Sequence, residues 1–267
     1  MEYLTLIVIG LAAGLFGGLL GIGGAVIMIP ALVIAFGENQ HLYHATAMIC
    51  NSFVAASATV VHKRAGALMP SVLKYLVPPA AVGIVIGVVI SNSSIFARQN
   101  SYLLARVLGL YMIYEIIYNC LRFKGSRDRG DGLDISGVHL SIPLTILTGF
   151  LTGLIGGLLG LGGGVVCVPF QQLFLKMPLK RAISNSAATV AAISLIGALY
   201  KNLTLPQQNI AIVESLKLAM VIIPGAIIGG LAGGRLMYIL PKNVVRAVFV
   251  LILAIASYKL LTVTPAV

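Results

Sequence analysis

Long apolar stretches that recur from one end of the chain to the other are the feature that most constrains how this sequence can fold. Windows near the roughly 20 residues needed to cross a bilayer fall at 3–36, 45–62, 72–91, 102–120, 140–176, 183–199, 214–234 and 243–262. Only 9% of the 267 residues are charged, against about a quarter in a soluble domain. The sequence therefore predicts an all-α integral membrane protein.

Two of these windows, 3–36 and 140–176, are too long for a single span, and each contains a glycine cluster. The clusters are GGLLGIGG at 17–24 and GGLLGLGG at 156–163, followed by Pro30 and Pro169 respectively. Without gaps, residues 10–32 and 149–171 share 12 identities in 23 positions. The chain thus contains an internal repeat, and we expect each long window to form two segments separated at the glycines.

The distribution of Lys and Arg between loops indicates how many segments there are. If each long window counts as two segments, thirteen of the eighteen basic residues lie on one side, leaving Arg98, Arg106, Lys201, Lys217 and Lys259 on the other. If each counts as one, the split is ten to eight. Because cytoplasmic loops are rich in basic residues, the first count predicts about ten transmembrane or re-entrant helical segments in two five-segment repeats.

An odd number of segments per repeat inverts the second repeat relative to the first. We expect a first membrane repeat at 1–120, a cytoplasmic linker at 121–139 and a second membrane repeat at 140–267. The protein is expected in the cell (inner) membrane, with both termini outside the cytoplasm. The segment count leaves open whether the broken windows are re-entrant hairpins or full crossings. The pieces after the glycines, about 12 residues or about 18 Å long, favour helices that stop within the membrane.

The glycine breaks are the predicted substrate-binding site. A helix that restarts at Gly24 or Gly163 presents unpaired N–H groups and a partial positive charge, which together bind anions. Glycines also let a ligand approach the backbone closely. The expected binding glycines are Gly21, Gly23, Gly24, Gly160, Gly162 and Gly163. The alternative role, close helix packing, is the one expected for Gly83, Gly87, Gly225, Gly229 and Gly233.

Small polar residues on the helix after each cluster are further candidates for contacts with an anion. They are Thr46, Asn51 and Ser52 in the first half and Ser184, Asn185 and Ser186 in the second. Their side chains can donate hydrogen bonds to anion oxygens, although hydrogen bonding between helices would explain them equally well. The sequence leaves open whether Thr46 or Asn51 corresponds to Asn185.

Few ionisable residues lie within the predicted spans, and the most internal is Glu115. It shares helical spacing with Tyr111, Tyr114 and Tyr118, so it could exchange protons, whereas the tyrosines could simply form an interfacial belt. Histidines 41, 44, 62 and 139 lie at predicted segment ends without metal-ligand spacing. We therefore expect neither a metal site nor a cofactor.

The duplicated core G-x-x-G-G-L-L-G-[IL]-G-G, here Gly14–Gly24 and Gly153–Gly163, resembles that of the TauE/SafE family of sulfite exporters, also called TSUP. The segment RAISNSAATVAAIS at 181–194 resembles the second conserved helix of the family. The resemblance implies a secondary transporter that exports a small sulfur-containing anion such as sulfite, sulfoacetate or thiosulfate. It also implies binding at the glycine breaks and at the small polar helices that follow them. From the inverted repeats we expect a site near the midplane and alternating access, with coupling to protons or sodium.

Other classes of function fit the sequence less well. A membrane receptor or scaffold that binds an anion without transporting it is the main alternative. An enzyme would need a nucleophile with a base or a metal constellation, and the sequence offers neither. The net charge of +11 is spread over short loops, which suits lipid head groups and not a nucleic-acid partner. The oligomeric state is not indicated.

Overall fold

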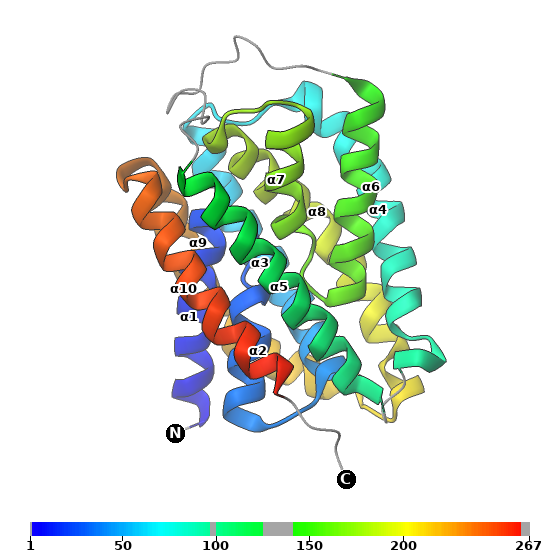
Figure 1. Ribbon diagram of the computed structural model, residues 1–267. Helices are drawn as coiled ribbons and strands as arrows, with labels where there is room; N and C mark the ends of the chain where they lie inside the picture. Colours follow the sequence, from blue (N-terminus) through cyan, green and yellow to red (C-terminus); the bar gives the residue numbers. More distant parts are fainter. Residues whose placement is uncertain (1, 97–99, 125–140, 263–267) are drawn as a thin grey trace.

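The computed structural model describes residues 2–96, 100–124 and 141–262 (Figure 1). All regular structure within these ranges is helical. The first half contains α1 (Glu2–Leu20), α2 (Ala25–Phe36), α3 (Gln40–Arg64), α4 (Pro70–Ser91), the 3-10 turn η1 (Ser94–Phe96) and α5 (Ser101–Lys124). The second half contains α6 (Ile142–Leu159), α7 (Gly164–Phe174), α8 (Leu179–Thr204), the 3-10 turn η3 (Leu205–Gln208), α9 (Ile212–Ile239) and α10 (Lys242–Leu261).

The helices confirm the prediction of an all-α membrane protein. Among the described residues, six stretches are long and apolar enough to cross a membrane: Tyr3–Leu20, Gln40–Arg64, Pro70–Ser91, Ile142–Leu159, Leu179–Gln208 and Ile212–Ile239. Large apolar side chains cover their outer faces, as at Leu203 and Met220, which are 70% and 66% exposed. Such an apolar surface suits contact with lipid. Helices can lie in lipid because they satisfy their own backbone hydrogen bonds.

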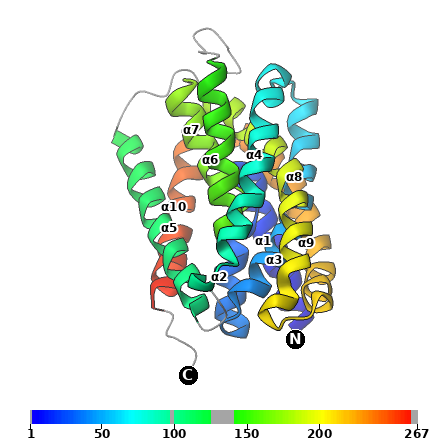
Figure 2. The ribbon, with the colours of Figure 1, turned by 90° about the vertical axis from the view of Figure 1, so that its right-hand side faces the viewer.

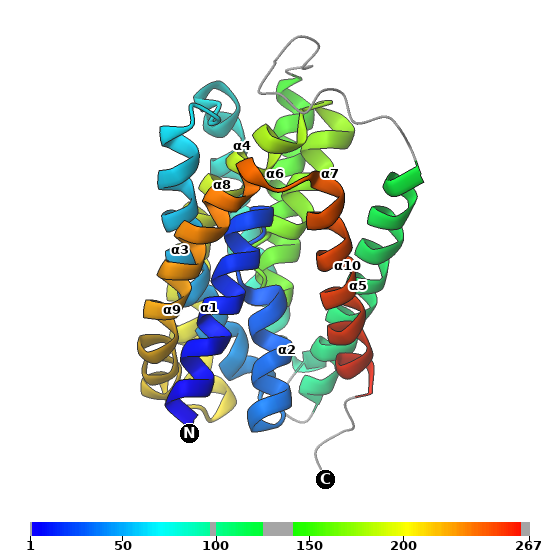
Figure 3. The same cartoon turned by 90° about the vertical axis from the view of Figure 1, so that its left-hand side faces the viewer.

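The chain reverses direction at each glycine cluster. α1 starts at the end of the molecule where the N-terminus lies, and α2 turns back toward that end (Figure 3). α3, α4 and α5 then alternate between the two ends. In the second half α6 starts at the opposite end, α7 turns back toward it, and α8 to α10 alternate until the chain finishes near the N-terminal end (Figures 1 and 2). α1 and α6, which lead into the two glycine clusters, therefore run in opposite directions (Figures 1 and 3).

Packing between the halves follows the same correspondence. α1 packs along α9 and α6 packs along α4, while α3 contacts α8 and α5 contacts α10. The starts of α2 and α7 are 139 residues apart (164 − 25), as are the starts of α3 and α8 (179 − 40). This constant spacing answers the register question: Thr46 corresponds to Asn185, and Asn51 corresponds to Val190.

Glycine stripes hold the long helices together. A Cβ added to Gly229 would overlap the carbonyl oxygen of Leu11 on α1, and one added to Gly87 would overlap that of Leu154 on α6. Similar overlaps occur at Gly83, Gly225 and Gly233. The packing role predicted for these five glycines is therefore confirmed, since small residues let helix backbones approach closely in a membrane.

The structure describes only the first residues of the segment predicted as a linker. α5 continues through Lys124, so the first four residues of the segment predicted as a linker at 121–139 are helical. The remaining residues, 125–139 with His139 among them, lie outside the described part of the chain. At the same end of the molecule, the Arg181 side chain donates hydrogen bonds to the carbonyls of Gly66 and Ala67, both at 3.3 Å. This contact joins the start of α8 to the loop between α3 and α4.

Candidate functional site

The predicted helix breaks at both glycine clusters are confirmed. α1 ends at Leu20 and α2 begins at Ala25, while α6 ends at Leu159 and α7 begins at Gly164. Within the breaks five glycines have positive φ: Gly21 (+66°), Gly23 (+76°), Gly160 (+70°), Gly162 (+67°) and Gly163 (+86°). Glycine adopts these angles without the penalty that a side chain imposes. Gly24 differs, because its φ is −86°.

The two breaks contact each other inside the protein. A Cβ on Gly164 would lie 2.6 Å from the carbonyl carbon of Ile22, so the first break packs against the start of α7. Asn51 of α3 connects them: its Oδ1 accepts a hydrogen bond from the Ala25 amide, and its Nδ2 donates to the Leu161 carbonyl, both at 2.9 Å. Asn51 thus links the start of α2 to the second break.

Ser186 of α8 makes a second connection. Its Oγ donates to the carbonyl of Gly21 at 2.7 Å and lies 3.3 Å from the carbonyl of Gly164. Both Ser186 and Asn51 are fully buried. We call this meeting point of the two breaks, with Asn51 and Ser186, the crossing.

The other four predicted polar residues use their side chains elsewhere. The hydroxyls of Thr46, Ser52 and Ser184 donate to carbonyls four residues earlier in their own helices, at 2.9, 3.3 and 2.7 Å. Asn185 accepts a hydrogen bond from the Met69 amide at 2.9 Å and so positions the residue that precedes α4. The structure therefore brings two of the six predicted polar side chains into contact with both breaks.

Two polar residues that sequence reasoning did not select lie against the second break. A Cβ on Gly160 would lie 2.6 Å from Cγ of His44, and one on Gly162 would overlap Oγ of Ser194. Both side chains are fully buried, and neither ring nitrogen of His44 nor Oγ of Ser194 has a hydrogen-bond partner among the described residues. Buried polar groups without partners are few in folded proteins and call for an explanation such as a ligand.

The prediction that Lys201 lies in a loop is wrong. α8 continues to Thr204, and the Lys201 side chain is 1% exposed. Its Nζ donates to Ser91 Oγ at 2.9 Å and Asn92 Oδ1 at 2.6 Å, and lies 3.0 Å from His41 Nδ1. Pro206 was the available signal for the end of this helix, because helices usually end at or before the residue that precedes a proline.

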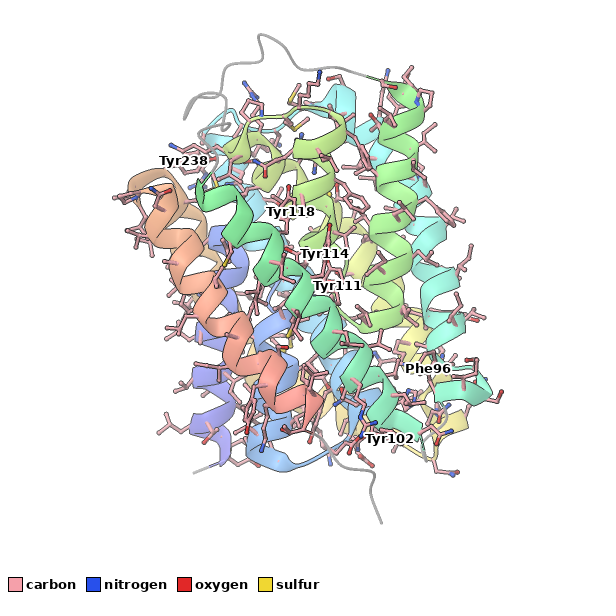
Figure 4. All side chains as sticks on the ribbon, in the orientation of Figure 1. Phe96, Tyr102, Tyr111, Tyr114, Tyr118 and Tyr238 are labelled. Atoms are coloured by element: carbon pink, nitrogen blue, oxygen red, sulfur yellow. The ribbon has the colours of Figure 1, made fainter. Side chains whose placement is uncertain are left out.

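The prediction that His41 and His44 lie at a segment end is confirmed, because α3 begins at Gln40. Both rings are nevertheless buried. His41 Nε2 lies 2.7 Å from the carbonyl oxygen of Phe96. His41 therefore contacts Lys201 through one ring nitrogen and the η1 turn through the other. Figure 4 labels Phe96 near the end of the molecule where the termini lie.

Glu115 and the three nearby tyrosines form the stripe that their spacing predicted. The stripe lies on α5, which contributes no residue to the crossing. Glu115 is buried, and its Oε1 accepts a hydrogen bond from the Tyr111 hydroxyl at 2.9 Å. The rings of Tyr111, Tyr114 and Tyr118 follow one another along α5, with centroids 6.0 and 6.3 Å apart (Figure 4). α5 packs mainly on α10.

Comparison with known proteins identifies the family. Residues 6–260 match the family described as "Sulfite exporter TauE/SafE". Three relatives carry the name "Probable membrane transporter protein". MamO of Paramagnetospirillum magneticum is 27% identical over 98% of this chain, YunE of Bacillus subtilis 22% over 88%, and MJ0441 of Methanocaldococcus jannaschii 28% over 74%. The alignments cover 45%, 89% and 72% of these relatives, so the chain spans less than half the length of MamO.

No solved structure matches the chain. The family match covers nearly the whole sequence, including both glycine breaks and the helices that follow them. The chain therefore belongs to the TauE/SafE sulfite exporter family of membrane proteins.

Proposed function

We propose that this protein is a secondary transporter that exports a small sulfur-containing anion, such as sulfite, sulfoacetate or thiosulfate. The observation that carries the proposal is the crossing, where two interrupted helices meet inside an apolar helical protein. Interrupted helices at the interface of two repeats are where many secondary transporters bind their substrates. The transporter names of the relatives support the same reading.

The second break offers the donors that an anion needs. The first amides of α7 have no acceptor within their own helix, and the helix start carries a partial positive charge. Ser194 Oγ lies against Gly162 and has no hydrogen-bond partner among the described residues. We propose that an oxyanion binds this hydroxyl together with the amides at the start of α7.

Two inverted five-segment repeats would move the anion by alternating access. The opposed directions of α1 and α6 support this arrangement (Figures 1 and 3), and α2 and α7, with 12 and 11 residues, are short enough to be re-entrant. The hydrogen bonds of Asn51 and Ser186 join the two repeats at the crossing. Each is worth about 0.5–1.5 kcal/mol net, which is small enough for them to break and re-form during transport.

Orientation and coupling complete the proposal. The loops with most basic residues face the cytoplasm under the positive-inside rule, so both termini lie outside it. Protons or sodium would drive transport. Glu115 is the candidate proton carrier, because a buried carboxylate within a membrane is a functional hypothesis by default.

Transport can be tested with purified protein in liposomes by measuring the flux of sulfite, sulfoacetate and thiosulfate. The informative variant is Ser194→Ala, which removes no hydrogen bond found in the structure and should leave the fold intact. Loss of one hydrogen bond to an anion should raise KM roughly tenfold. Thr59→Ala is the matched control, because its hydroxyl bonds the Ala55 carbonyl of its own helix.

Equal KM values for Ser194→Ala and Thr59→Ala would refute the proposal that the anion binds at the crossing. Binding of the three anions without flux under any gradient would instead favour the alternative function, a membrane anion receptor or scaffold.

A further inference from the structure

A second group of polar side chains is buried at the end of the molecule where the termini lie. We call it the Lys201 cluster and define it as Gln40, His41, His44, Ser91 and Lys201, each at most 1% exposed. Its residues come from the start of α3, the end of α4 and the last turns of α8. Phe96, whose carbonyl oxygen lies 2.7 Å from Nε2 of His41, is at this end of the protein (Figure 4).

Among the described residues, Lys201 has only uncharged hydrogen-bond partners. They are Ser91, Asn92 and His41, and no described carboxylate forms a hydrogen bond or an ion pair with its Nζ. A buried ammonium group without an opposite charge is strongly unfavourable, so a bound anion would stabilise the charged form of Lys201.

Donors without acceptors lie at the start of α3, the segment that also carries His41. Both side-chain atoms of Gln40, Nε2 and Oε1, and both ring nitrogens of His44 have no hydrogen-bond partner. The two residues are four apart on α3 and so share one face of the helix. Lys201 Nζ lies 3.0 Å from Nδ1 of His41, and His44 follows His41 by three residues on the same side of α3. A neutral imidazole carries one N–H and a glutamine amide two, so three N–H groups at the start of α3 lack an acceptor.

We propose that the Lys201 cluster is a second binding site for a small oxyanion. Lys201 supplies the charge, while Gln40 and His44 donate hydrogen bonds to the oxygens. A cation would be repelled by the ammonium group.

The site also lies between the end of the molecule and the crossing. His44 belongs to the Lys201 cluster and packs on Gly160 of the second break, one helical turn from His41, or about 4.5 Å along α3. If the protein transports anions as proposed above, the Lys201 cluster is an intermediate binding site on their path, between the crossing and the end of the molecule where the termini lie. Binding itself does not depend on transport.

Equilibrium binding of radiolabelled thiosulfate to the purified protein tests the site without requiring flux. Unlabelled sulfite and nitrate serve as competitors. Gln40→Leu removes no hydrogen bond found in the structure, so it should fold, and Lys201→Met removes the charge whereas Lys201→Arg keeps it. We expect two binding components in the wild type, one of them weakened roughly ten- to a hundredfold in Gln40→Leu and Lys201→Met. Lys201→Arg and the control Thr59→Ala should bind within a few-fold of the wild type.

The Ser194→Ala variant separates this site from the crossing, because it should weaken the other component only. A binding curve of Gln40→Leu that agrees with the wild type within twofold would overturn the proposal, as would failure of the wild type to bind thiosulfate, sulfite or nitrate. If the protein binds anions through Lys201 but shows no flux in liposomes, the proposed transport function is refuted and the proposed second binding site is retained.

Discussion

Replacing Asn51 with alanine should destabilise the protein more than any other single hydrogen-bond deletion in α3. Asn51 satisfies two backbone groups that have no substitute in a helix break, the Ala25 amide and the Leu161 carbonyl, each at 2.9 Å. A buried polar group left unsatisfied costs about 1–3 kcal/mol. Two such groups predict a loss of about 2–6 kcal/mol in the free energy of unfolding.

The assay is equilibrium unfolding in mixed detergent micelles, with Thr59→Ala as the comparison. Thr59 lies on the same helix and also loses a side-chain hydrogen bond, to the Ala55 carbonyl at 2.6 Å. That carbonyl keeps its helical hydrogen bond, so the control should change stability by less than about 1 kcal/mol. Asn51→Ala should also reduce the maximal flux, since the two breaks lose a connection.

A difference of less than about 1 kcal/mol between Asn51→Ala and Thr59→Ala would refute the reasoning, because it falls below the cost of even one unsatisfied backbone group. It would mean that water or a shift of the break satisfies both groups. The crossing would then be a contact between helices that carries little of the stability.

Three further results are expected. Gly153→Ala should destabilise by about 1–3 kcal/mol in the same unfolding assay, because its Cβ would overlap a carbonyl of α4, whereas a Cβ on Gly109 would meet side-chain atoms and no backbone, so Gly109→Ala should destabilise less. In a background without the native cysteines, a membrane-impermeant thiol reagent should label Lys63→Cys from the cytoplasmic side and Gln207→Cys from the other; the reverse pattern would invert the proposed orientation. Glu115→Gln should abolish the response of flux to a pH gradient while preserving exchange without one, and an undiminished response would exclude it as the proton carrier.

The breaks could be predicted from the sequence because they depend on local properties. Gly21 and Gly160 sit where the chain must adopt positive φ, and the duplication marked both positions independently. The polar contacts were harder to predict. A serine or threonine in a helix can always donate to its own backbone, as Thr46 and Ser184 do, so their presence does not reveal whether they face a partner on another helix.

The two bridging residues illustrate the same limit. Asn51 was among the candidates, but the residue that corresponds to it in the second half is Val190. The second half contributes Ser186 instead. A duplicated sequence therefore does not require a duplicated hydrogen-bond network, because each repeat needs only to satisfy the groups that the other exposes.

By itself the sequence determined that this chain is helical, belongs in a membrane and is interrupted twice, because apolar composition and glycine φ angles act over a few residues. Only the tertiary structure decided which polar groups meet. Asn51 bonds a carbonyl 110 residues away, and Lys201 contacts His41 across 160 residues. Such pairings depend on how each helix is rotated and how deeply it sits against its neighbours, and no local pattern in the chain specifies either.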